Sequence, residues 1–86
     1  MASSNAIDNI QANYDTAKNG LYQTTILLHR LNDHLMCELF QETLKKLQNQ
    51  PHDDDYIKET VRMIDEVKTL LNECVEELKA ADNVQL

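Results

Sequence analysis

Apolar residues recur every three or four positions along most of this chain, the spacing that places side chains on one face of an α-helix. In the first half, this apolar stripe comprises Ile7, Ile10, Tyr14, Ala17, Leu21, Leu28, Leu31 and Leu35, with Thr24 in its one polar position. After Leu35 the register shifts, and Phe40, Leu44 and Leu47 continue the stripe. A strand would need sustained alternation in twos, which is missing. The pattern predicts a helix over about residues 5–48.

A second stripe of the same kind runs through the last third of the chain. Its members are Ile57, Ile64, Val67, Leu71, Cys74, Leu78 and Ala81. Val61, Leu70 and Val75 widen it on either side, and Tyr56, Met63 and Leu70 form a second apolar row seven residues apart. The stripe predicts a helix over about residues 54–82, with an apolar face broad enough to pack against more than one neighbour.

The segment between the stripes predicts a polar turn over about residues 49–53. Pro51 disfavours a helical conformation at Gln50. The aspartates at positions 53–55 supply a cap and favourable negative charge for the next helix N-terminus. They lack the glycine and the distal glutamate of a calcium-binding loop, so we interpret them as capping residues.

Asn19-Gly20 leaves the helix count open. These residues could end a first helix and allow the chain to fold back as a three-helix bundle. Alternatively they lie inside one long helix, continuous or merely kinked, which the stripe favours because it crosses them without losing phase. In that second case the first helix is longer than the second and overhangs it. The fold class is all-α in both cases: an antiparallel helical hairpin or a three-helix bundle.

Composition and charge narrow the class of function. The 86 residues form a single helical domain, and one Gly and one Pro provide too few turns for a many-stranded β fold. Fifteen acidic and eight basic residues give a net charge of -7, which argues against nucleic acid or an anionic membrane as partner.

The sequence shows no recognisable signal peptide or membrane span, and its cysteines form no close pair; these features predict a cytoplasmic protein. The longest apolar run, residues 26–28, is far too short to span a membrane, and the first residues lack the pattern of a signal peptide. Cys37 and Cys74 form no close pair, and we interpret them as buried or half-buried free thiols. We therefore expect a soluble cytoplasmic protein.

The chemistry-bearing residues predict neither catalysis nor a bound cofactor. The carboxylates lie opposite the apolar stripes, interleaved with lysines, as on a solvated helix face. His34 and Cys37 are three residues apart on one helix face, where two ligands could share a zinc ion. A metal-responsive regulator using these two residues is our third hypothesis, while no metal site is predicted.

Partner binding is the function that the sequence favours. The candidate partner-binding residues are Tyr14, Leu21, Tyr22, Leu28, Met36 and Met63. Aromatic residues are enriched at interfaces, and methionines adapt to different partners. Three of the candidates, Tyr14, Leu21 and Tyr22, belong to the portion expected to overhang. We predict a non-catalytic protein-interaction module, such as a small adaptor, co-chaperone or complex subunit; the alternative is a homodimeric four-helix bundle.

Two helical families share parts of this pattern. The stretch from Leu35 to Leu47, followed by a polar break and residues 57–78, resembles the last two helices of BAG domains. The segment from Tyr56 to Ala81 is similar to part of tubulin-binding cofactor A. Because two unrelated families match about equally, shared helix patterning accounts for both resemblances, and we assign neither family.

Overall fold

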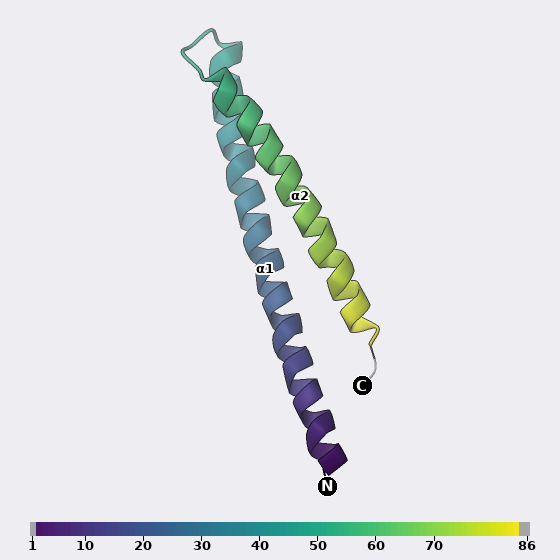
Figure 1. Cartoon of the computed structure of the whole chain (residues 1–86). Coiled ribbons are helices and arrows are strands. Elements are labelled where there is room, and N and C mark those ends of the chain that lie inside the picture. The colour runs from purple at the N-terminus through teal and green to yellow at the C-terminus, as the bar shows by residue number, and fades with distance from the viewer. Residues whose placement is uncertain (1, 85–86) are drawn as a thin grey trace.

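The chain folds into two helices that pack antiparallel as a hairpin (Figure 1). The computed structural model describes residues 2–84, with side-chain burial from Asn5 onward. Helix α1 spans Ala2–Leu47 and α2 spans Asp54–Asp82, and the described residues include no strand. The all-α hairpin predicted from the sequence is confirmed.

Helix α1 continues without interruption through Asn19-Gly20, which decides between the two predicted architectures. Gly20 has no positive φ angle, and the Thr24 hydroxyl donates a hydrogen bond to its carbonyl at 2.9 Å, as in a regular helix. Figure 1 shows α1 as one unbroken helix along its length. The chain is therefore a two-helix hairpin, and the three-helix alternative is not observed.

The turn between the helices is fixed by local hydrogen bonds. The Gln50 amide donates to the Lys45 carbonyl at 2.8 Å, and the Asn49 amide donates to Lys46 at 3.2 Å. With Asn49 at φ 57°, this is a Schellman motif, in which Asn takes the left-handed position that ends a helix. Asp53 then caps α2 by accepting a hydrogen bond from the Tyr56 amide at 3.0 Å.

The helices meet along a seam of buried and half-buried residues spaced three and four apart. On α1 the seam comprises Tyr14, Lys18, Leu21, Thr25, Leu28, Asn32, Leu35, Leu39 and Glu42; on α2 it comprises Ile57, Thr60, Ile64, Val67, Leu71, Cys74, Leu78 and Ala81. The centre of the core is Leu35, Ile64 and Val67. The buried hydroxyls of Thr25 and Thr60 donate to backbone carbonyls one turn earlier, at 2.9 and 2.7 Å, which satisfies them inside the apolar seam.

The seam of α2 matches its predicted stripe, whereas that of α1 differs from it. Ala17, Thr24 and Leu31 were expected in the seam and are exposed; the residue after each of them takes the seam position instead. Likewise Phe40, Leu44 and Leu47 are exposed, and the seam continues through Leu39 and Glu42 without the predicted register shift. The physical reason is that the apolar face of α1 is wider than one neighbouring helix can cover.

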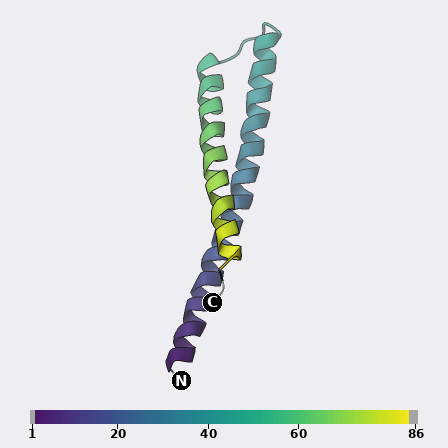
Figure 2. The ribbon, with the colours of Figure 1, turned by 90° about the vertical axis from the view of Figure 1, so that its right-hand side faces the viewer.

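The hairpin is elongated rather than globular. Its principal extents are 72 × 15 × 15 Å, and its radius of gyration of 20.0 Å compares with about 12 Å for a compact domain of this length. The described side chains from Asn5 to Asn13 are all exposed, because α2 ends beside Tyr14. The overhang is thus real but shorter than predicted, with the N-terminal end of α1 extending past the end of α2 (Figure 2). Tyr14 contacts Ala81 and Lys18 contacts Asp82 at the end of α2, so Leu21 and Tyr22 belong to the paired length of α1.

Candidate partner-binding surface

Polar contacts join the two helices at both ends of the seam. Near the C-terminus of α2, the Tyr14 hydroxyl donates to the Ala81 carbonyl, and Lys18 pairs with Asp82. A hydrogen bond and the charge of Asp82 raise the pKa of Lys18. These contacts hold the C-terminal end of α2 against α1 at the last residues of the apolar seam.

The turn end is joined by a denser set of contacts. Glu42 accepts hydrogen bonds from Lys45 at 3.0 Å and from the Asp53 amide at 3.3 Å, and these bonds lower its pKa. Lys46 pairs with Asp54 at 2.9 Å, and the hydrogen bond from Lys46 is the main cause of the lowered pKa of Asp54. The carboxylates of this end are therefore held in their charged form.

The Tyr56 hydroxyl shows which edges of the two helices lie on the same side. It donates to the Glu38 carboxylate at 3.0 Å, and this bond is the main cause of the raised pKa of Tyr56. Glu38 and Tyr56 each come directly before a seam residue. Residues that precede seam residues therefore share one side of the hairpin, and residues that follow seam residues share the other.

The first side carries an exposed apolar surface that we call the Leu31 face. It consists of Leu27 and Leu31 on α1 with Met63 and Leu70 on α2, and Ala17, Gly20 and Thr24 extend it toward the N-terminus. The exposed fractions are 62% for Leu27, 42% for Leu31 and 49% for Leu70. Exposed apolar residues grouped on one face of a hairpin are consistent with binding a partner.

The second side carries the Met36 face, which consists of Tyr22, Met36 and Phe40 on α1 with Val61 on α2. Tyr22 and Met36 follow the seam residues Leu21 and Leu35, and Val61 follows Thr60. All four residues are exposed, Phe40 most of all at 67%. The hairpin therefore offers two apolar faces, one on each side of the seam.

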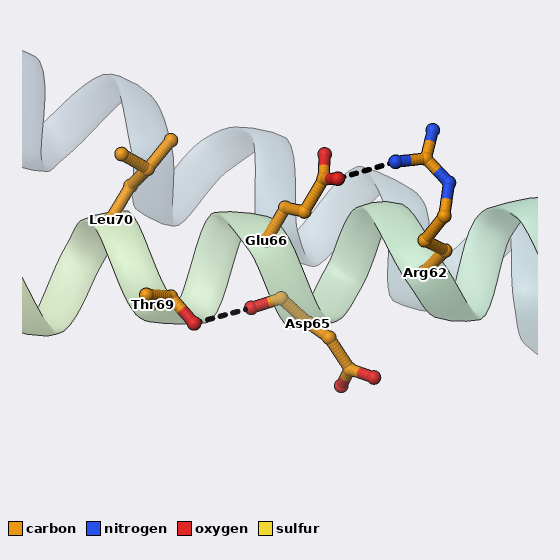
Figure 3. A pocket seen from close by; sticks show the side chains of 5 residues that line it. All are labelled: Arg62, Asp65, Glu66, Thr69 and Leu70. Carbon is orange, nitrogen blue, oxygen red and sulfur yellow. Dashed lines mark hydrogen bonds and ion pairs between the residues drawn. The ribbon is translucent and has the colours of Figure 1, made fainter.

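The two faces differ in the charge along α2. Glu59, Glu66 and Glu73 recur every seven residues beside the Leu31 face, and Glu77 adds to the same edge. In Figure 3, Glu66 and Leu70 rise from one edge of α2, with Arg62 paired to Glu66. The Met36 face is bordered along α2 by residues of both charges that follow seam residues, namely Lys58, Lys68 and Lys79 with Asp65 and Asp82.

The outer side of α2 is hollowed beside the Leu31 face. A depression of about 480 Å³ is lined by Arg62, Asp65, Glu66, Thr69 and Leu70 (Figure 3). A second depression of about 460 Å³ follows it along the helix and is lined by Thr69, Asn72, Glu73, Glu76 and Glu77. Both are open; the first is lined by two acidic residues and one basic residue, and the second by three acidic residues. They therefore suit the edge of a protein surface better than an enclosed small-molecule site.

The six residues proposed from the sequence do not form one surface. Tyr14, Leu21 and Leu28 are half-buried in the seam, while Met63 lies at its edge against the core. Tyr22 and Met36 are exposed on the Met36 face. Sequence reasoning missed Leu27, Leu31 and Leu70 as surface residues; the seven-residue recurrence of Glu59, Glu66 and Glu73 was the available signal, since it marks a solvent-facing edge.

Candidate metal ligands are dispersed. Among the described residues, no three His, Cys, Asp or Glu side chains converge as a metal site would require. Cys74 is half-buried as expected, but Cys37 is exposed, which corrects the expectation of a buried thiol. Cys37 lies two positions after the buried Leu35, about 200° around the helix, and therefore points away from the seam.

Comparison with known proteins gives no relative for this chain. Neither the family models, nor the curated proteins, nor the solved structures include a match. None of the described helices has the length and apolarity needed to cross a bilayer. The function of this chain is therefore inferred from the surface of the hairpin itself.

Proposed function

We propose that this chain is a non-catalytic protein-interaction module, an adaptor or complex subunit that presents an apolar helical surface to a partner protein. The main support for this proposal is the amount of exposed apolar surface on an elongated hairpin. The titratable groups with shifted pKa values support the same proposal, because all of them belong to exposed contacts between or along helices rather than to a shared cleft.

The surface area supports this proposal quantitatively. The chain exposes 6660 Å², whereas a compact monomer of 9.9 kDa exposes about 5,200 Å². A standard protein interface covers roughly 800 Å² on each partner, so the excess exceeds what one such interface needs. Covering it would supply apolar burial that a two-helix core lacks.

The experiment is quantitative co-purification of the tagged chain from its own cells, with three matched variants. One variant carries Leu27→Lys and Leu31→Lys, the second carries Met36→Lys and Phe40→Lys, and the control carries Thr16→Lys and Gln23→Lys. All six positions are exposed, and the control adds the same charge on the outer side of α1. Each variant must first show the helical circular dichroism of the parent.

We expect a protein in stoichiometric amount that the parent and the control retain and that at least one face variant loses. If both face variants retain everything that the control retains, the apolar faces bind no partner and the proposed function is wrong.

A homodimeric four-helix bundle is the second candidate function. It is favoured by the same excess of surface, because the broad apolar face of one hairpin could cover that of another. A net charge of -7 on each copy opposes it. Sedimentation equilibrium under reducing conditions distinguishes the candidates: a mass of 9.9 kDa at all concentrations rules out the homodimer, and a stable dimer supports it.

A further inference from the structure

The apolar stripe of α1 is not centred on α2 but is shifted toward the side of the hairpin on which the Leu31 face lies. On α1 the seam contains four polar or charged residues, Lys18, Thr25, Asn32 and Glu42, although apolar side chains lie one position before Lys18 and Asn32, at Ala17 and Leu31. An apolar stripe that is centred off the one neighbouring helix is the pattern of a helix that packs between two neighbours.

Gly20 supports a close approach to the Leu31 face. Inside a helix, glycine is less favourable than alanine, and nothing in the hairpin requires it here. Its φ angle is not positive, and a methyl group at this position would meet nothing within 4 Å. The lack of a side chain instead lets the backbone of another helix come near α1 between Ala17 and Thr24.

Charge indicates the chemistry of the approaching helix. Along the α2 edge of the Leu31 face, Glu59 and Glu66 are paired with Arg62. No ion pair among the described side chains involves Glu73 or Glu77, which lie on this edge beyond Leu70. On the α1 edge, Gly20 and Leu27 carry no charge, while Glu38 accepts a hydrogen bond from Tyr56 and lies 4.0 Å from His34. The negative charges without a partner among the described residues of this face are therefore those of Glu73 and Glu77, on the α2 edge.

From these observations we infer that the Leu31 face binds one α-helix of a partner protein, whose apolar stripe packs on Leu31 and Leu70, beside Gly20, and whose basic flank meets Glu73 and Glu77. This inference rests on the proposed function and specifies its site and partner class. The excess surface of the chain is ample for one added helix. The Met36 face is bordered along α2 by lysines as well as aspartates and has no equivalent of Gly20, so it suits such a helix less well.

The test uses the full chain and two synthetic helical probes of about three heptads each. Both probes carry leucines along one stripe; one has lysines flanking the stripe, and the other has glutamates there. Affinity is measured by fluorescence anisotropy at low and high salt. The protein variants are Gly20→Leu, the pair Glu73→Lys with Glu77→Lys, and the control pair Met36→Ser with Phe40→Ser.

We expect the lysine probe to bind the parent more tightly than the glutamate probe, with an affinity that falls as salt screens the charges. Gly20→Leu should weaken binding about tenfold while the melting temperature does not fall, because leucine is the better helix former. The glutamate-to-lysine pair should reverse the preference between the probes, and the control pair should change neither affinity.

Several results would overturn the inference without touching the proposed function. They are no binding of the lysine probe, equal binding of both probes, loss of binding in the control pair, or unchanged binding in Gly20→Leu. A dimer of the chain that Gly20→Leu abolishes would assign the face to a second copy and would also overturn it. Co-purification that depends only on the Met36 face would leave the proposed function standing and refute this site.

Discussion

The hydroxyl of Tyr14 donates a hydrogen bond to the carbonyl of Ala81, a residue 67 positions later in the chain. This contact marks the point at which α2 ends and α1 continues alone as the overhang. It also places a tyrosine that the sequence suggested as a partner contact inside the hairpin. The helix pair is thus closed by a specific polar contact at the end opposite the turn.

Removing that hydroxyl tests its contribution. Tyr14→Phe should lower the free energy of unfolding by about 0.5–1.5 kcal/mol, the usual net value of one hydrogen bond. The loss should be local, with faster amide hydrogen exchange in the last turn of α2 and unchanged exchange around Val67. Unaltered exchange near Ala81 would mean that the hydroxyl does not hold this end in solution.

The core is small enough that one residue should decide the stability of the fold. Ile64 is 4% exposed and packs at the centre of the seam, so Ile64→Ala should lower the free energy of unfolding by about 2–4 kcal/mol. Leu47→Ala is the matched control, because Leu47 is 76% exposed and its loss should change stability little. Denaturant titration of both variants compares them, and similar losses would contradict the described core.

Gly20 offers a substitution that should stabilise the hairpin. A methyl group at this position meets no neighbour, and the backbone is helical, so Gly20→Ala should raise the free energy of unfolding by about 0.5–1 kcal/mol. Thermal melting followed by circular dichroism measures the gain. A decrease would show that α1 is broken or kinked at this glycine in solution.

Asn32 places a polar group in the seam. Its side-chain carbonyl is buried and accepts no hydrogen bond from the described residues. Replacing it by leucine should raise the free energy of unfolding by about 1 kcal/mol or more, because an unsatisfied acceptor is exchanged for apolar packing. Sedimentation should accompany the melting experiment, since a polar residue in a helix–helix seam can also specify the oligomeric state. A loss of stability would indicate that the amide is well satisfied.

The turn end should weaken in acid. The pKa of Glu42 is lowered in the folded state, so the folded state binds fewer protons than the unfolded chain near that pKa. The stabilisation by Glu42 is therefore fully present above its ordinary pKa of about 4.3 and is lost as pH falls through the lowered value. We expect the melting temperature of the parent to exceed that of Glu42→Gln at pH 7, and the difference to shrink as the pH falls below the ordinary pKa of a glutamate. A difference that does not depend on pH would contradict this account.

The sequence by itself determined the local structure of this protein. The three-and-four spacing of apolar residues specified both helices, and Pro51 with the following aspartates specified the turn, because these signals act through the backbone within a few residues. The stripe of α2 was also predictable, since all seven of its predicted members are buried or half-buried in the seam, while Val61 and Leu70 beside it remain exposed.

The pairing of α1 was decided only by the tertiary structure. Its apolar face is wider than one helix, so spacing alone could not tell that Thr25 and Asn32 would face α2 while Thr24 and Leu31 remained exposed. Nor could spacing decide whether Gly20 ends a helix, because that choice depends on whether a neighbour packs along the continuing helix. The Leu31 face therefore emerged only once α2 had a defined position: a surface left uncovered is a property of how two helices meet, and neither helix encodes it alone.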